Sequence, residues 1–169
     1  TVTNINLKLN KKKSNSVGKA CKKYIIKILK NNKLCGPMEI GEIICYSPNL
    51  FKKYYNSKIL KKNIFYKNYF KTGDLGYLDK DKYLYYVGRQ KNLVKINGLS
   101  VYPEEIEKKI KEFLNLKNFI ITGSKSYLGN EKLILFTENF KRSELVKLNK
   151  FVNSKLEKYE IPEKIINLK

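Results

Sequence analysis

A chain of 169 residues with 42% hydrophobic content can bury a core, which excludes a disordered protein and leaves room for one ordinary domain or two small ones. The formal charge of +21 comes almost entirely from lysine, because Arg89 and Arg142 are the only arginines. Base recognition relies on the bidentate fork of arginine, so lysines spread along the whole length favour a solvated surface over a specific nucleic-acid site.

Neither the N-terminal residues nor the cysteines indicate secretion. No stretch reaches the roughly 18–20 apolar residues of a membrane span, and the chain opens on polar residues and lysines instead of a signal core. Cys21, Cys35 and Cys45 are odd in number and too widely spaced for a metal motif, and histidine is absent. We therefore expect reduced thiols, no metal site, and an intracellular protein that is cytoplasmic or organellar.

The first half of the chain predicts a small, mostly β unit. A lysine-rich segment at residues 11–16 is predicted to be an exposed loop. Runs of strand character are separated by turn residues and cover residues 24–29, 40–46, 76–78 and 83–87. The stretch 75–87 predicts a hairpin whose turn is Asp79-Lys80-Asp81-Lys82.

Beyond residue 89 the pattern changes. Asn97-Gly98 is the strongest short hairpin signal in the chain, and strands are predicted on either side of it at residues 93–96 and 99–101. Pro103 then opens a helix, since proline suits the first turn and the acidic residues that follow suit the helix dipole. Its predicted inward face consists of Ile106, Ile110, Phe113 and Leu114.

The remaining elements complete an α+β unit. Strands are predicted at residues 119–122 and 133–137, and a last short strand at 165–166. A second amphipathic helix is predicted at residues 143–158, with Leu145, Leu148, Val152 and Leu156 inward. The fold class is therefore α+β, with a mostly β subdomain at residues 1–89 followed by a small α+β domain at residues 90–169.

Three linked segments carry a specific signal. They read YFKTGDLGYLD at residues 69–79, VGRQKNLVKING at 87–98 and VYPEEIE at 101–107. Their order and spacing resemble the adenylate-forming (AMP-binding) superfamily of acyl-CoA synthetases, luciferases and peptide-synthetase adenylation domains, and VYPEEIE is most similar to acyl-CoA synthetases of the coumarate–CoA ligase type. Weaker resemblances are SVGK at 16–19, GEI at 41–43, NLFKKYY at 49–55 and YEIP at 159–162.

The resemblance implies a nucleotide site at Asp74 and Arg89. Asp74 would hold both ribose hydroxyls, because a carboxylate accepts two hydrogen bonds at once, and Gly73 would let the backbone come close. Arg89 would contact ribose and phosphate. The structural alternatives are a turn cap for Asp74 and a surface salt bridge for Arg89.

The resemblance also implies a hinge and a mobile domain. Lys91 falls at the hinge, about which the C-terminal domain rotates between an adenylating and a thioester-forming arrangement. In the second arrangement Lys95, the candidate catalytic residue, would touch the intermediate, and Asn97 and Gly98 would lie beside the pantetheine arm of CoA. Taken alone, Asn97-Gly98 is a hairpin turn.

Three positions depart from the family pattern, and two parts of it are missing. Lys82 stands where the turn usually has glycine, which costs little if that turn needs no positive φ. Asn97 and Ser100 stand where some coumarate-type relatives carry other polar residues, which leaves the role of Ser100 open. We find neither the Ser/Thr/Gly-rich phosphate loop nor the late lysine expected well beyond Ile161-Pro162. The chain is therefore expected to be the C-terminal portion of a longer enzyme and inactive alone.

The implied activity is that of an acyl-CoA synthetase. The intact enzyme would use ATP and Mg²⁺ to adenylate a fatty or aryl acid and would transfer the acyl group to CoA. The expected partners are thus ATP or AMP, an acyl substrate and CoA, with no specific nucleic acid, no transmembrane segment, and peripheral membrane contact left open. The alternatives are an adenylation domain that loads a carrier protein, a non-catalytic remnant that binds nucleotide or a partner, and DNA binding through bulk charge.

Overall fold

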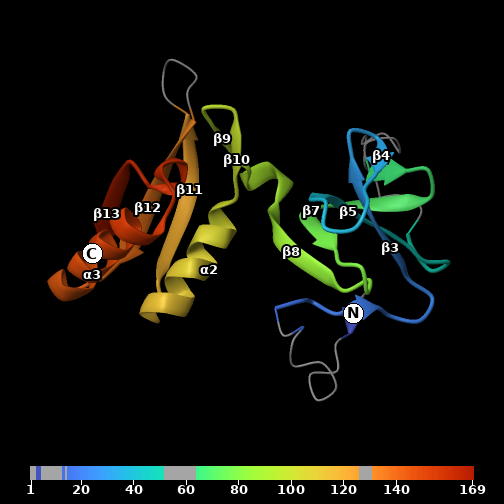
Figure 1. Cartoon of the computed structure of the whole chain (residues 1–169), viewed down its shortest axis with the longest axis horizontal. Coiled ribbons are helices and arrows are strands. Elements are labelled where there is room, and N and C mark those ends of the chain that lie inside the picture. Colours follow the sequence, from blue (N-terminus) through green and yellow to red (C-terminus); the bar gives the residue numbers. More distant parts are fainter. Residues whose placement is uncertain (1–2, 5–12, 14, 52–63, 126–130) are drawn as a thin grey trace. The chain divides into compact units, whose positions relative to one another are not determined.

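The computed structural model describes residues 3–4, 13, 15–51, 64–125 and 131–169. The chain divides into two compact units, Thr1–Gln90 and Lys91–Lys169 (Figure 1). The first is mostly β, and the second combines strands with helices, so the predicted α+β class is confirmed. Within the described residues, no helix is long and apolar enough to cross a membrane.

The first unit is built on a six-stranded antiparallel sheet. Its strands are β3 (Ile25–Lys30), β4 (Lys33–Leu34), β5 (Gly41–Tyr46), β6 (Phe65–Tyr66), β7 (Tyr69–Leu78) and β8 (Leu84–Arg89). They run in the order β4-β3-β5-β7-β6, with β8 paired to β7, and β1 (Thr3–Asn4) pairs separately with β2 (Lys19–Ala20). The strands predicted at 24–29, 40–46 and 83–87 are therefore confirmed to within a residue or two.

The strand predicted at residues 76–78 is only the end of β7, which is much longer than expected. Glycine and aspartate are poor strand formers, so the sequence pattern around Gly73 and Asp74 does not predict a strand. Close packing fixes the strand at Gly76. A Cβ added there would lie 2.4 Å from the carbonyl oxygen of Tyr85 and 2.9 Å from Cδ1 of Ile43. Only glycine lets the neighbouring strands approach this closely.

The hairpin between β7 and β8 forms as predicted, and its turn does require a positive φ at Lys82. Lys82 has a φ of 64°, in the left-handed region that glycine favours. The replacement of glycine by lysine is therefore not free of strain. The backbone N–H of Lys82 itself donates to the carbonyl of Asp79 at 3.0 Å, which closes the turn.

The predicted exposed loop at residues 11–16 is described only at Lys13, Asn15 and Ser16, and it is not exposed throughout. Ser16 is buried, and its hydroxyl donates to the carbonyl of Lys13 at 2.8 Å. Residues 11, 12 and 14 lie outside the described residues, as do residues 52–55 of the NLFKKYY segment.

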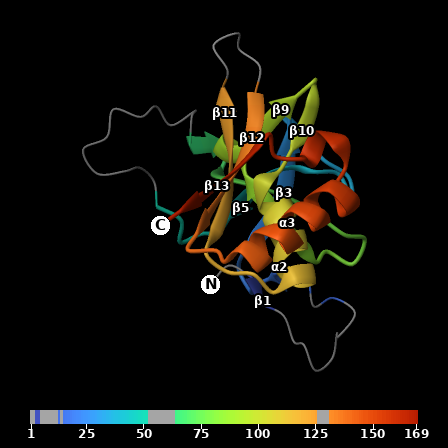
Figure 2. The same ribbon diagram turned by 90° about the vertical axis from the view of Figure 1, so that its left-hand side faces the viewer.

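The second unit opens with a hairpin and closes with a mixed sheet. Its elements are β9 (Val94–Ile96), β10 (Leu99–Val101), α2 (Pro103–Leu114), β11 (Phe119–Lys125), β12 (Glu131–Glu138), α3 (Arg142–Lys155) and β13 (Lys164–Leu168). The sheet order is β11-β12-β13, with β12 and β13 parallel. The two helices lie side by side against this sheet (Figure 2). This is the predicted order of elements.

Helix α2 begins at Pro103 and ends at Leu114, and it is capped by Asn115, whose φ of 49° and N–H bond to the carbonyl of Lys111 close the last turn. Ile106 and Ile110 are fully buried, as predicted. Phe113 was placed on the wrong side: its side chain is 69% exposed, and its ring contacts Phe151 of α3 at 5.4 Å. Leu114, its neighbour in the same turn, packs against the core instead.

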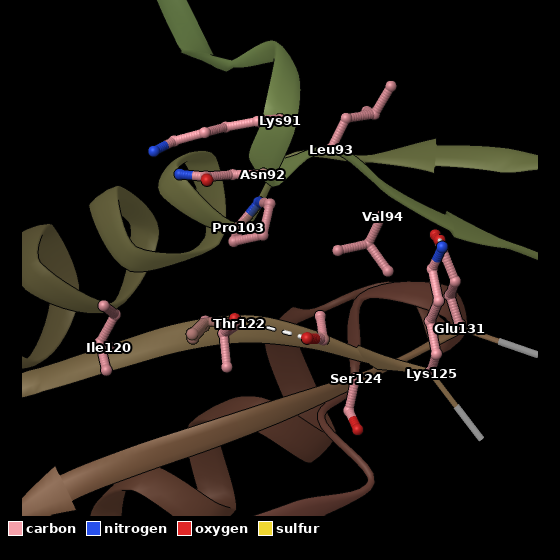
Figure 3. Close-up of a pocket in the computed structure, with 12 residues that line it drawn as sticks. Lys91, Asn92, Leu93, Val94, Pro103, Ile120, Thr122, Ser124, Lys125 and Glu131 are labelled. Carbon is pink, nitrogen blue, oxygen red and sulfur yellow. Dashed lines mark hydrogen bonds and ion pairs between the residues drawn. The ribbon is translucent and has the colours of Figure 1, made fainter. Parts of the chain in front are cut away.

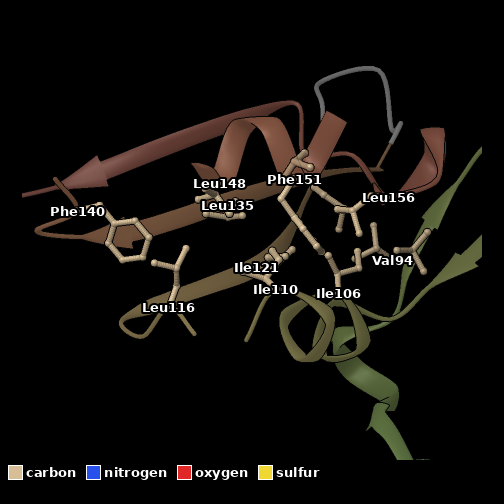
Figure 4. Packing of buried hydrophobic residues seen from close by; sticks show 13 residues of the cluster. Val94, Ile106, Ile110, Leu116, Ile121, Leu135, Phe140, Leu148, Phe151 and Leu156 are labelled. Atoms are coloured by element: carbon tan, nitrogen blue, oxygen red, sulfur yellow. The ribbon is translucent and has the colours of Figure 1, made fainter. Parts of the chain in front are cut away.

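Helix α3 ends at Lys155, earlier than the predicted residue 158, and a 3-10 turn follows at Lys158–Glu160. Leu148, Val152 and Leu156 enter the core as predicted, and Leu145 packs at its margin. Phe151 was not predicted to be buried, yet it is 6% exposed and belongs to the cluster (Figure 4). This core gives the second unit an interior of its own.

Candidate functional site

Asp74 and Arg89 face each other across the β7–β8 ladder. They are register partners, and Nε of Arg89 lies 2.7 Å from Oδ1 of Asp74. The two side chains are 28% (Asp74) and 52% (Arg89) exposed, so the pair stays within reach of solvent and contributes only about 0–1 kcal/mol to stability. Arg89 thus forms the salt bridge of the structural alternative. The same contact places a guanidinium beside a carboxylate. A carboxylate can accept hydrogen bonds from a diol, and a guanidinium can donate hydrogen bonds to a phosphate.

A bulge in β7 presents Asp74. Between two successive register pairs, β5 advances from residue 42 to 44 while β7 runs from 75 back to 71, so β7 carries two extra residues. The hydroxyl of Thr72 fills the broken ladder: it donates to the carbonyl of Ile43 at 2.8 Å and accepts the N–H of Asp74 at 3.1 Å. Gly73, with a φ of 73°, makes the bend.

Glu42 supports the bulge from the neighbouring strand. Its carboxylate accepts the N–H of Gly73 at 3.2 Å and lies 3.6 Å from Nζ of Lys71, and its side chain is only 10% exposed. Sequence reasoning placed Glu42 in the GEI segment without giving it a role. The structure brings that segment into contact with the TGD segment, and the GEI resemblance was the signal that pointed to it.

Lys91 opens the second unit in a 3-10 turn, Gln90–Asn92, where it is exposed. The turn is fixed to α2 by the amide of Asn92, whose Nδ2 donates to Oε1 of Glu104 at 2.7 Å. The predicted hinge residue therefore lies directly before a point at which the chain is anchored. The nucleotide candidates belong to the first unit, and the hinge and hairpin candidates belong to the second.

Lys95, Asn97 and Gly98 lie together on the β9–β10 hairpin, and all three are exposed. Positive φ angles at Asn97 (50°) and Gly98 (82°) indicate a two-residue type I′ turn, as the sequence predicted. Lys95 is the register partner of Ser100, and its Nζ donates to the Ser100 hydroxyl at 2.5 Å. Ser100, whose role the sequence left open, therefore directs the Lys95 ammonium.

An open groove of about 270 Å³ runs beside this hairpin within the second unit (Figure 3). Lys91 and Asn92 border one end of it, and Lys125 and Glu131 border the other. Val94 forms part of its wall, and it packs so closely on β11 that a Cβ at Gly123 would lie 2.6 Å from its Cγ2. The groove therefore has polar residues at both ends and an apolar residue, Val94, in its wall.

The described residues contain no group of three or more Cys, Asp and Glu side chains arranged to hold a metal ion. The three cysteines are free thiols. Burial raises the pKa of Cys45, and burial, followed by the nearby Glu39 carboxylate, raises that of Cys35. Neither thiol therefore has the lowered pKa of a reactive nucleophile.

No family model matches the chain. The 2-succinylbenzoate–CoA ligase of Bacillus subtilis is 30% identical over 156 residues, which cover 92% of this chain and 32% of that protein. The long-chain-fatty-acid–CoA ligase of Bacillus subtilis is 28% identical over 132 residues, which cover 77% of this chain and 24% of that protein. The chain thus spans about a third, or less, of the length of these curated relatives.

A solved structure agrees over nearly the whole chain. The o-succinylbenzoate CoA synthetase of Bacillus subtilis, in complex with its acyl-adenylate intermediate, matches 99% of this chain and 35% of its own chain, with a TM-score of 0.89 and 28% identity. The same enzyme in complex with ATP and a magnesium ion matches with a TM-score of 0.88.

Proposed function

The chain belongs to the adenylate-forming superfamily of acyl- and aryl-CoA ligases, and we propose from this premise that it is part of an ATP-dependent acid–thiol ligase. In the first half-reaction a carboxylate oxygen of the acid attacks the α-phosphorus of MgATP and pyrophosphate leaves. In the second the thiol of CoA attacks the acyl carbonyl, AMP leaves and the thiol proton is released. Residues 1–89 would close the nucleotide-binding domain, and residues 90–169 would form the mobile domain.

The observation that carries the proposal is the pair formed by Asp74 and Arg89. A ribose diol donates two hydrogen bonds, and the Asp74 carboxylate can accept both. A phosphate accepts hydrogen bonds from a guanidinium. Arg89 supplies one on the adjacent strand, with its Nε 2.7 Å from Oδ1 of Asp74. Thr72 and Glu42 hold the bulge that sets this geometry, so the pair is organised before a nucleotide arrives.

The second unit would serve the thioester-forming step. Lys91, at the start of this unit, is the proposed hinge, because rotation about an element boundary needs few backbone changes. Lys95 would touch the acyl-adenylate, and Asn97 and Gly98 at the exposed tip would flank the pantetheine arm. Substrates named for the relatives include an aryl acid and long-chain fatty acids, and we propose an aryl acid first.

The test is carboxylate-dependent exchange between ATP and pyrophosphate, using the protein expressed with whatever adjoining sequence its gene encodes. The acids offered would be 2-succinylbenzoate, benzoate and fatty acids of graded length. We expect exchange with an aryl acid and release of free acyl-CoA when CoA is added. Retention of the acyl group on a phosphopantetheinylated carrier protein would reassign the acceptor, and no exchange with any acid would overturn the proposal. The 169 residues alone are expected to be inactive, because the relatives are about three times as long.

Asp74→Ala should reduce this exchange by about a hundredfold or more, because each hydrogen bond lost to a charged group costs about 1.5–3 kcal/mol and 1.4 kcal/mol is a factor of ten. The matched control is Asp81→Ala, which removes a carboxylate of the same unit that is 65% exposed and pairs with Lys13. Exchange should persist in the control. Unchanged exchange in Asp74→Ala would remove this residue from the ribose role.

A further inference from the structure

The backbone N–H of Lys95 points away from its own hairpin. In an antiparallel pair, residues that exchange hydrogen bonds alternate with residues that do not. Ile96 and Leu99 flank the two-residue turn and form the bonded pair, so Lys95 and Ser100 form the next, non-bonded pair. The N–H of Lys95 therefore has no acceptor within the hairpin and is available to an acceptor from outside it.

Glu131 is that acceptor. It is the first residue of β12, and its Oε2 accepts the Lys95 N–H. Its Oε1 lies 3.8 Å from Nζ of Lys125, its register partner on β11, and its side chain is 23% exposed. Figure 3 shows the Lys125 and Glu131 side chains extending together from the sheet towards the hairpin. The carboxylate thus joins the sheet to the hairpin at the end of the groove.

The packing of the residues on either side of Lys95 links this hydrogen bond to the position of the Lys95 side chain. Val94, the preceding residue, is 3% exposed and is locked against Gly123, and Ile96, the next residue, packs against the core. The backbone of Lys95 is therefore fixed on both sides by packing and at its own N–H by Glu131. With the backbone fixed, Ser100 can hold the ammonium in one direction.

We propose that Glu131 is a positioning residue for Lys95: by accepting the Lys95 N–H, it fixes the hairpin in the orientation that presents the Lys95 ammonium to the acyl-adenylate. The effect on catalysis rests on the proposed function, whereas the effect on the hairpin does not. Glu131 itself does not touch the reacting atoms in this scheme. Its loss should therefore weaken the thioester-forming step and spare the adenylating step.

The first experiment measures amide hydrogen exchange of the chain by NMR at constant pH. In Glu131→Ala, exchange at the Lys95 amide should rise about tenfold or more, because a hydrogen bond to a charged acceptor is lost. Glu131→Gln keeps a carbonyl acceptor and should restore much of the protection. The amides of Ile121 and Leu135 serve as an internal reference for the folded core.

The matched control is Glu163→Ala, which removes another carboxylate at the same sheet, one that pairs with Lys132. It should leave exchange at Lys95 unchanged. Equal protection of Lys95 in wild type and Glu131→Ala, with the core amides intact, would overturn the proposed contact. If the core amides of Glu131→Ala also lose protection, Glu131→Gln decides. Faster exchange at Lys95 with the core amides intact supports the contact, because a neutral acceptor bonds more weakly than a carboxylate, and wild-type exchange at Lys95 overturns it.

The second experiment compares the two half-reactions in the active protein. Glu131→Ala should slow thioester formation from preformed acyl-adenylate by about tenfold or more, while ATP–pyrophosphate exchange stays within about twofold of wild type. Glu131→Gln should recover most of the thioester rate. An equal fall in both half-reactions would overturn the positioning role. A wild-type protein without either activity would overturn the proposed function, and the exchange experiment would still decide the contact.

Discussion

The bulge around Gly73 depends on two side chains. Glu42 accepts the Gly73 N–H across 31 positions of sequence, a contact that depends on strand register. The Thr72 hydroxyl acts as both donor and acceptor, because it bonds the carbonyl of Ile43 and the N–H of Asp74.

Lys82 offers a test of backbone strain. Its φ of 64° lies in the region where a side chain costs about 1–2 kcal/mol, whereas glycine pays about 0.5–1 kcal/mol in chain entropy. Lys82→Gly should therefore raise the free energy of unfolding by up to about 1 kcal/mol. Urea denaturation followed by circular dichroism measures this change. The control, Lys80→Gly, alters an exposed lysine of the same turn without positive φ and should not stabilise; equal gains in both variants would contradict strain at Lys82.

The same turn contains a buried carboxylate with a shifted pKa. Burial alone would raise the pKa of Asp79, but hydrogen bonds from the Lys13 ammonium and from the N–H groups of Tyr83 and Asp81 outweigh it and hold the pKa below its usual value of about 3.8. A carboxyl with a lower pKa in the folded state adds stability above its unfolded-state pKa. That stability is lost as the pH falls through the folded-state pKa.

Asp79→Asn should therefore lower the urea midpoint at pH 7, and the deficit relative to wild type should shrink as the pH falls below about 4. Urea titrations at several pH values between about 2 and 7 measure it. Asp81→Asn, at the exposed partner of Lys13, should have a smaller effect at every pH. A deficit for Asp79→Asn that is constant with pH would assign the loss to packing instead of charge.

At the scale of elements, local signals predicted where most strands and helices lie. Strands β3 and β5, the Asn97-Gly98 hairpin and the start of α2 at Pro103 were all predictable, since apolar runs and turn residues mark them. The ends of elements were less predictable, because they depend on tertiary contacts. Phe113 has the spacing of a core residue but is exposed, whereas Leu114 of the same turn packs against the core, and α3 stops at Lys155 although its amphipathic pattern continues.

Of the candidate site, the individual residues were predictable from the resemblance, but their pairing was not. The contact of Arg89 with Asp74 depends on the β7–β8 register, which includes an irregularity between Leu75 and Gly76. The acceptor for Lys95 comes from a strand that begins 36 positions later in the sequence. Periodicity within a segment carries no information on such contacts.

At the scale of the whole molecule, each unit has its own core. A cavity made in one core should therefore weaken the amide protection of that unit alone. Ile44 in the first unit and Ile110 in the second are both 0% exposed, and isoleucine-to-alanine changes in a core cost about 2–5 kcal/mol. Hydrogen exchange with mass spectrometry should show faster exchange in β11 and β12 for Ile110→Ala. For Ile44→Ala the faster exchange should appear in β3, β5 and β7.

The control for this experiment is Val146→Ala on α3, whose side chain is 62% exposed and whose replacement should change stability by no more than about 0.5 kcal/mol. Equal loss of protection in both units, from either core variant, would contradict two separate cores. It would instead indicate that the chain unfolds as one cooperative body.

The few acidic residues of this lysine-rich chain often hold its backbone in place by accepting hydrogen bonds from N–H groups. In the part of the chain that the structure describes, backbone N–H groups donate to the side chains of Glu39, Glu42, Asp79, Glu107, Glu131, Glu144 and Glu160. Most of the lysines in that part lie on the surface and could be exchanged for other polar residues at little cost. A saturation mutagenesis scan should therefore find the tolerance of this protein to be strongly asymmetric in charge: permissive at its many cations and restrictive at its few anions.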